Sequence, residues 1–283
     1  MTGGFKIADF LLYSNLWIAL NALAQAAQTR FLLSGRVQLS PALGFVFFGT
    51  LFLYALHRIG GLGQLAPFTA FGRYKAISEH KAHLRVYAGI GLIGALVLYL
   101  FFPWRIQWML ALPGLVALGY VLPLGASGKR LRDLHFLKIF LLAIVWAWIT
   151  VWLPAAELQA DMQKTTLWMG LERAAYIFAL TIPFDIRDLE VDRHTRVKTL
   201  PGALGIAPVL ALALLMLIAM LLFAGRNAYS TGVWAGLACS AAVSFLLILF
   251  ARRVQHDYYF SGLLDGMMIL QFLLVLAGAR FLT

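Results

Sequence analysis

Four of the chain's twelve acidic residues lie within eight positions, at Asp185, Asp188, Glu190 and Asp192. On a helix each residue advances about 100°, so Asp185, Asp188 and Asp192 share one face, within an arc of about 60°. Glu190 points nearly the opposite way. Carboxylates this close together repel one another, and beside an apolar segment they resist leaving water. Three of them on one face suit Mg²⁺, which binds carboxylates and bridges to substrate phosphates.

A different interpretation is that these acids are paired with nearby basic residues in a solvated loop. The candidate partners are Arg187, Arg193, Arg196 and Lys198. Two features favour the metal site over this alternative: the shared helix face, and the apolar run at 174–182 directly before the cluster.

Apolar stretches of about 20 residues, the length that crosses a bilayer core as a helix, recur along the whole chain. The chain has 283 residues, of which 62% are hydrophobic and 12% are charged. Soluble globular proteins carry about 25% charged residues, so a soluble protein is excluded. We predict an all-α integral membrane protein with a single transmembrane domain over residues 1–283. The nine expected spans are 9–29, 43–60, 83–102, 105–124, 136–154, 166–187, 204–224, 231–250 and 260–281.

The net charge of +11 could indicate nucleic-acid binding, but the basic residues lie in short loops between apolar runs. In such loops they determine topology and contact anionic lipid headgroups, so we expect a lipid bilayer and no nucleic acid as partner. Basic residues are more numerous after the even-numbered spans. The positive-inside rule then places these loops, the N-terminus and the acidic cluster in the cytoplasm. We expect a bacterial cytoplasmic (inner) membrane.

The segment from Asp185 to Gly205 resembles the second aspartate-rich motif of the UbiA superfamily of intramembrane prenyltransferases. The acidic spacing is followed by basic residues and by Thr-Leu-Pro at 199–201. The nine spans and the cytoplasmic motif are also similar to that family. The resemblance implies a bundle of about nine transmembrane helices around a central cavity. It also implies transfer of an isoprenoid group from a prenyl diphosphate to a lipophilic, commonly aromatic, acceptor, with Mg²⁺ as cofactor.

The resemblance implies a role for particular residues of that segment. Asp185, Asp188 and Asp192 would be the catalytic metal ligands, and Lys198 would contact the diphosphate. Mg²⁺ would neutralise the leaving diphosphate, and a dry cavity would protect the allylic cation from water. Family members often place a Tyr and a Lys-Arg pair after span four. Tyr120 and the pair Lys129 and Arg130 are similar, so this pair is a second candidate diphosphate contact, or else a pair of ordinary topology charges.

The family's first motif, N-x-x-x-D-x-x-x-D, is absent from the end of span two. The chain has no carboxylate at 54–61 and carries His57 and Arg58 there. Arg58 could bind a phosphate directly in place of a metal ion. Alternatively, His57 and Arg58 extend to the lipid headgroups, or Arg58 pairs with the Asp185 face.

Two functions are compatible with the sequence. One is a Mg²⁺-dependent prenyltransferase, favoured by the acidic motif. The other is a non-catalytic protein of the same fold that binds a lipid, a quinone or a protein partner, favoured by the missing first motif. A transporter is less consistent with the sequence, because no pair of broken helices marks an internal repeat.

Overall fold

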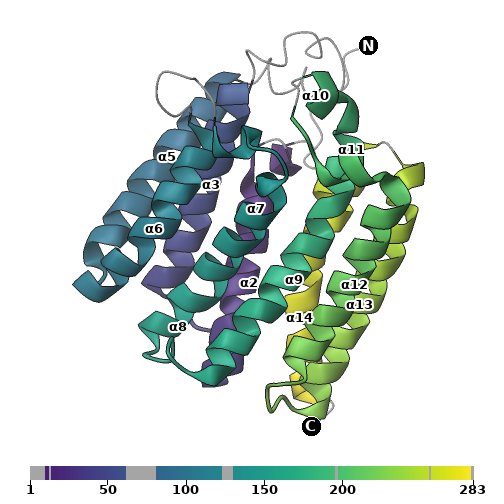
Figure 1. Cartoon of the computed structure of the whole chain (residues 1–283). Coiled ribbons are helices and arrows are strands. Elements are labelled where there is room, and N and C mark those ends of the chain that lie inside the picture. Colours follow the sequence, from purple (N-terminus) through teal and green to yellow (C-terminus); the bar gives the residue numbers. More distant parts are fainter. Residues whose placement is uncertain are drawn as a thin grey trace.

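The computed structural model describes residues 10–12, 14–61, 81–122, 130–194, 197–254 and 256–281, and the regular structure of this part of the chain is helical (Figure 1). Seven long helices are uninterrupted: α2 (Leu16–Ser34), α3 (Pro41–Gly61), α5 (Lys81–Phe101), α6 (Trp104–Val121), α9 (Lys164–Arg187), α12 (Ile206–Ala224) and α13 (Thr231–Phe250). Two more contain π-helical turns: α7 (Leu137–Ala147) continues through η3 (Trp148–Trp152) into α8 (Leu153–Glu157), and η5 (Tyr258–Leu264) continues into α14 (Asp265–Phe281). The short elements are η2 (Leu131–Asp133), α10 (Leu189–His194), α11 (Leu200–Leu204) and η4 (Ala251–Arg253).

Each of the nine predicted spans corresponds to one of these long helical segments, and the all-α membrane fold is confirmed. The largest difference in position concerns the first span, predicted at 9–29 and found at Leu16–Ser34. The helix ends where Gly35 adopts a left-handed φ of 71° and its N–H bonds to the carbonyl of Phe31. The prediction stops before Arg30 because a lone charge is costly in lipid. Arg30 is instead buried in the protein and paired with Glu157.

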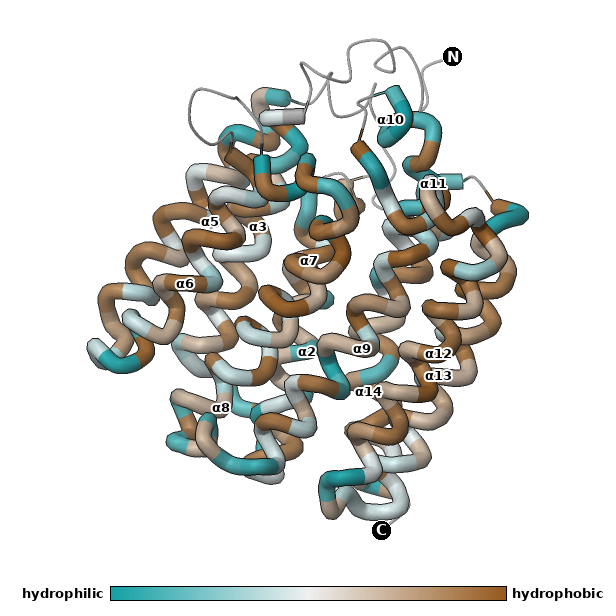
Figure 2. The backbone as a smooth tube through the Cα atoms, in the orientation of Figure 1, coloured by the Kyte–Doolittle hydropathy of each residue, from teal (hydrophilic) through white to brown (hydrophobic). Residues whose placement is uncertain are grey.

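Within the described residues, six helical segments are long and apolar enough to cross a membrane. They are α3, α5, α7 with its continuation to Glu157, α12, α13, and η5 with α14. The other three long segments are α2, α6 and α9. Helices α2 and α9 are more polar, and most of their polar side chains face other helices. Gln25 and Arg173, for example, have no exposed surface. Figure 2 shows the same distribution, with hydrophobic helix bodies and hydrophilic residues concentrated toward the two ends of the bundle.

The helices pack as a closed ring. Each helix contacts the next one in the order α2, α3, α6, α7, α9, α12, α13, α14, and α14 in turn contacts α2. Helix α5 packs on α3 outside this ring. Helices α10 and α11 lie at one end of the bundle, and α8 lies toward the opposite end (Figure 1). The acidic motif, at the end of α9 and in α10, therefore lies at the end of the bundle opposite α8.

Candidate functional site

A cavity of about 230 Å³ lies inside the ring, between α2, α3, α6, α7, η3, α9 and α14. Its walls are mostly apolar, with Leu53, Val145 and Ile149 as aliphatic examples. Four larger aromatic side chains also line it: Tyr54, Tyr120, Trp146 and Phe184. A volume of this kind, apolar and enclosed by membrane helices, can hold a hydrocarbon chain.

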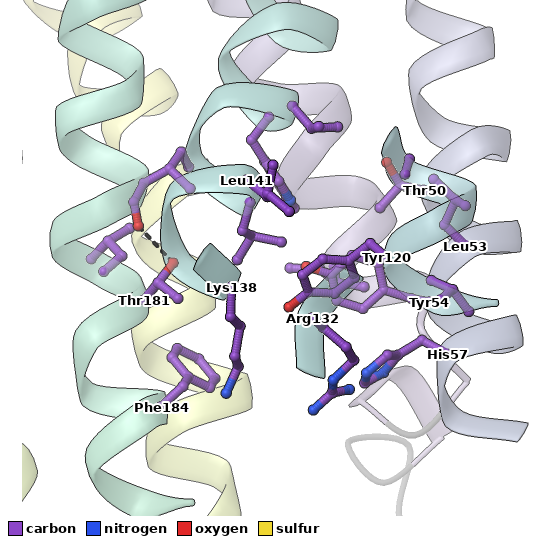
Figure 3. A pocket seen from close by; sticks show the side chains of 18 of the residues that line it. Thr50, Leu53, Tyr54, His57, Tyr120, Arg132, Lys138, Leu141, Thr181 and Phe184 are labelled. Carbon is purple, nitrogen blue, oxygen red and sulfur yellow. Dashed lines mark hydrogen bonds between the residues drawn. The ribbon is translucent and has the colours of Figure 1, made fainter. Parts of the chain in front are cut away.

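One end of the cavity is charged. Asp185 and Asp188 at the end of α9, Lys138 in the first turn of α7, and Arg132 in η2 contribute to its wall there. His57, near the end of α3, joins them. Figure 3 shows that the side-chain ends of Lys138, Arg132 and His57 lie at the same end of the cavity. The site therefore combines an apolar interior with a mouth that carries both signs of charge.

Asp185 and Asp192 share the ammonium group of Lys138. Nζ of Lys138 is 2.7 Å from Oδ1 of Asp185 and 3.5 Å from Oδ2 of Asp192. Asp185 and Asp192 are 2% and 4% exposed. Burial raises the pKa of Asp192, the charges of Asp185 and Asp188 add to this rise, and the charge of Lys138 opposes it. Lys138 thus connects α7 to both α9 and α10.

Asp188 is bound by the neighbouring residue Arg187. Nε of Arg187 donates to Oδ1 of Asp188 at 2.8 Å, and Nη2 donates to Oδ2 at 3.3 Å. The guanidinium carbon of Arg187 also lies 5.0 Å from the ring centroid of Phe184 and 4.9 Å from that of Phe260. The two rings and the carboxylate hold this side chain in one orientation.

Mg²⁺ needs carboxylate oxygens that are available to it. In this structure the oxygens of Asp185 and Asp192 face an ammonium group, and those of Asp188 face a guanidinium group. In the described part of the chain, no three His, Cys, Asp or Glu side chains gather in a group that could hold a metal. This arrangement does not fit the Mg²⁺ site that the sequence predicts.

The predicted diphosphate contacts lie apart from the cavity wall. Arg58 donates from Nη2 to the carbonyl of Leu12 at 3.2 Å, and so reaches toward the N-terminal segment. Lys198 is exposed. Arg130 is paired with Asp133, with Nη2 to Oδ1 at 3.0 Å. None of these three lines the cavity. Lys129 lies outside the described residues.

The pair of Arg130 and Asp133 organises the loop before α7. Asp133 accepts hydrogen bonds from the backbone N–H, Nε and Nη2 of Arg130. Burial alone would raise the pKa of Asp133, but these bonds and the charge of Arg130 outweigh it and hold the pKa below its usual range. The loop is thereby fixed with the next basic residue, Arg132, in the cavity wall.

Arg132 and Lys138 are site residues that the sequence does not predict. Both follow span four, where basic residues are expected for topology alone, and no local pattern separates the two roles. Within the described residues Arg132 makes no ion pair, and its guanidinium carbon is 5.9 Å from the ring centroid of Tyr120. His57 also faces the cavity, and its Nε2 is buried without a hydrogen-bond partner among the described residues.

One π-helical segment borders the cavity, and the other ends directly before a cavity residue. Ile149 of η3 lines the cavity wall, and so does Asp265, the first residue of α14, which follows η5. Single π-turns inside longer helices are frequent at functional sites, because they rotate the side chains that follow. A polar residue in an apolar span often indicates a cavity, and Asp265 is such a case.

Comparison with known proteins supports the fold. No protein-family model and no curated protein sequence matches the chain. A solved digeranylgeranylglyceryl phosphate synthase is similar with a TM-score of 0.56 and 14% identity, over 95% of this chain and 97% of that chain. A UbiA homologue from Archaeoglobus fulgidus bound to GPP and Mg²⁺ gives a TM-score of 0.56 and 12% identity, over 94% and 98%. The same homologue bound to DMAPP and Mg²⁺ gives 0.57 and 11%, over 96% and 99%. At such identities the similarity shows the fold, and this chain has the helical membrane fold of UbiA-type prenyltransferases.

Proposed function

We propose that this chain is an intramembrane prenyltransferase, which binds a prenyl diphosphate in the cavity and transfers its isoprenoid group to a lipophilic, aromatic acceptor. The observation that carries this proposal is the form of the cavity, which is apolar inside and charged at one end. A prenyl diphosphate likewise consists of an apolar part, its hydrocarbon tail, and a charged part, its anionic head. The UbiA homologue of the same fold was solved with two such ligands, GPP and DMAPP.

The tail would occupy the aliphatic interior, and the diphosphate would lie at the charged mouth beside Arg132 and Lys138. Asp185 and Asp188 also face the mouth, and with Asp192 they hold Lys138 and Arg187 in place. Arg58, Arg130 and Lys198 would act further out, as basic residues that attract the diphosphate toward the mouth. Lys129, outside the described residues, stays a candidate diphosphate contact. These basic residues also suit a cytoplasmic membrane face, where such a ligand would enter from the cell interior.

In the transfer, the bond between the allylic carbon and the diphosphate oxygen breaks, and the diphosphate leaves with the electron pair. Tyr54, Tyr120 and Trp146 line the cavity, and the faces of such rings stabilise a nearby cation. The enclosed walls exclude the water that would otherwise capture the cation. The acceptor carbon then forms the new bond and loses a proton.

Binding of GPP to the purified full-length protein tests the proposal. Because a hydrogen bond to a charged group contributes about 1.5–3 kcal/mol, we expect Arg132→Gln to weaken binding about tenfold or more, measured by isothermal titration calorimetry. Arg252→Gln is the matched control: Arg252 is exposed, also follows an even-numbered span, and does not line the cavity. The proposal would be contradicted if both variants lost GPP affinity equally, or if the wild type bound no GPP.

A non-catalytic binding protein is the second candidate. It is favoured by the end of α3, which carries His57 and Arg58 where the family motif has carboxylates. Catalysis releases inorganic diphosphate, whereas binding does not. Incubation of the protein with radiolabelled GPP and a bacterial lipid extract therefore separates the two. A labelled lipid product with matching diphosphate release identifies a transferase, and GPP binding without release identifies the binding protein.

A further inference from the structure

Lys138 occupies the space between the two most deeply buried carboxylates of the acidic motif. Its Nζ is 2.7 Å from Asp185 Oδ1 and 3.5 Å from Asp192 Oδ2. The three side chains are 13%, 3% and 6% exposed. An ion pair with so little water around it is weakly screened, and it holds the ammonium group in this position.

A divalent ion and this ammonium group need the same place. Mg²⁺ lies about 2.1 Å from the oxygens that bind it. An ion on Asp185 Oδ1 would therefore lie close to Lys138 Nζ, and two positive charges at such a separation repel strongly where water is scarce. Lys138 belongs to the first turn of α7, which packs against α9. Its side chain would have to leave a buried position before an ion could enter.

The remaining acidic groups do not provide a substitute site. Asp188 is bound in two places by Arg187, and Arg187 lies against two aromatic rings. The end of α3 faces the cavity with His57 and offers no carboxylate. Asp265 also lines the cavity wall, but it belongs to no group of three possible metal ligands. Among the described residues, the mouth therefore offers positive groups to a ligand and no open set of carboxylates to an ion.

An ammonium group has three N–H donors. Nζ of Lys138 pairs with Asp185 and Asp192 by charge, and Asp185 Oδ1 accepts no hydrogen bond within the described residues. Lys138 also lines the cavity, so its donors can face a ligand there. Arg132 also lines the mouth and adds a guanidinium group suited to phosphate oxygens. Lys138 and Arg132 therefore supply two positive charges at the mouth without a bound ion.

We propose that Lys138 takes the place of a divalent cation, so that this cavity binds a prenyl diphosphate through Lys138 and Arg132 without a metal ion. The identity of the ligand rests on the proposed function. The exclusion of the ion rests on the ion pairs alone, and the two parts are tested separately.

The first test uses Mn²⁺ alone as a probe for the ion site, with the purified full-length protein and no prenyl ligand. Free Mn²⁺ gives an electron paramagnetic resonance signal that decreases when the ion is bound. We expect the wild type to bind no Mn²⁺ at this site. Lys138→Met frees two carboxylates and removes the repelling charge, so binding of Mn²⁺ should appear in this variant. Lys164→Met is the control, because Lys164 is exposed at the opposite end of the bundle.

Three outcomes decide the first test. Binding of Mn²⁺ that appears in Lys138→Met, and disappears again when Asp185→Asn is added, supports the proposal. Binding of Mn²⁺ by the wild type that is lost in Asp185→Asn overturns it. A folded Lys138→Met protein that binds no Mn²⁺ also overturns it, because Lys138 would not be the group that excludes the ion. If Lys138→Met does not fold, Lys138→Gln provides the same measurement with a hydrogen-bond donor retained between the carboxylates.

The second test measures GPP binding by calorimetry with Mg²⁺ and with EDTA. We expect the same Kd for the wild type in both conditions, and weaker binding for Lys138→Gln in EDTA. Wild-type binding that is lost in EDTA overturns metal independence. If no GPP binds in any condition, the proposed function fails, and the Mn²⁺ measurement still decides whether Lys138 excludes a metal ion.

Discussion

At the scale of single residues, Val145 and Ile144 are neighbours in α7 with opposite surroundings. Val145 lines the cavity, whereas Ile144 is 57% exposed on the outer surface of the helix bundle. A large side chain at Val145 would fill the cavity, whereas one at Ile144 would only alter the surface that faces lipid. Comparing the two positions therefore distinguishes these effects on the same helix.

We expect Val145→Trp to place an indole in the cavity and to abolish GPP binding, because the space for the hydrocarbon tail is lost. Ile144→Trp should bind GPP as the wild type does, since its indole extends into lipid. Calorimetry with GPP measures both, and thermal unfolding checks that both variants are folded. Wild-type affinity in a folded Val145→Trp protein would show that the tail does not bind in this cavity.

At the scale of helices, polar contacts in the membrane interior join elements that are distant in the sequence. The guanidinium group of Arg173 on α9 donates to the carbonyl of Gln25 on α2 at 2.9 Å, and to Oγ1 of Thr150 in η3 at 3.1 Å. Arg173 has no exposed surface. A buried polar residue in an apolar span can indicate either a cavity or an interhelical hydrogen bond, and here the hydrogen bond is observed.

Helices α3 and α5 also pack closely on each other, and Gly91 of α5 makes this close packing possible. A Cβ atom at Gly91 would lie 2.7 Å from the backbone nitrogen of Phe52 and 2.8 Å from the carbonyl oxygen of Phe48. Gly89, on the same helix, has open space at its Cβ position. Small residues at such crossings allow membrane helices to approach closely.

We therefore expect Gly91→Ala to lower the free energy of unfolding by about 1–3 kcal/mol, because the two backbones must move apart. Gly89→Ala should be neutral or should stabilise by up to about 1 kcal/mol, since alanine favours the helix over glycine. Thermal unfolding of both variants in one detergent provides the comparison. A Gly91→Ala protein as stable as Gly89→Ala would contradict the tight packing of α3 on α5.

At the scale of the whole molecule, the two ends of the bundle differ in basic residues. The end with α10 carries the basic residues of the cavity mouth together with Arg187, Arg193, Lys198, Arg252 and Arg253. At the opposite end Arg30 is paired with Glu157, and Arg105 is paired with Asp161 at 2.7 Å. The positive-inside rule predicts that the cavity mouth faces the cytoplasm.

Cysteine labelling tests this orientation, in a Cys239→Ala background that removes the natural thiol. In intact bacterial cells, we expect a membrane-impermeant maleimide to label Lys164→Cys and to leave Arg252→Cys unlabelled. After permeabilisation both should be labelled. Labelling of Arg252→Cys in intact cells, with Lys164→Cys protected, would reverse the orientation and place the cavity mouth outside.

Most of the fold could be predicted from the sequence, because the length and hydropathy of a membrane helix are properties of one continuous segment. Each of the nine predicted spans falls on a long helical segment, six of which are apolar enough to cross a membrane, and the one-face spacing of Asp185, Asp188 and Asp192 is likewise local. The boundary of α2 could not be predicted, since the charge of Arg30 is satisfied by Glu157, far away in the sequence. The extent of the domain over residues 1–283 and the roles of the site residues stay predictions.

Membrane-spanning helices, and a dense acidic motif after one of them, could be inferred from local stretches of the chain. The groups that this motif faces depend on how the helices pack. Asp185 and Asp192 meet Lys138 because α7 packs against α9. Arg132 of η2 lines the cavity, whereas Arg58 donates to the carbonyl of Leu12. The physical reason is that a charge in a membrane protein acts on what lies within a few ångströms of it, and that neighbourhood depends on which helices pack together.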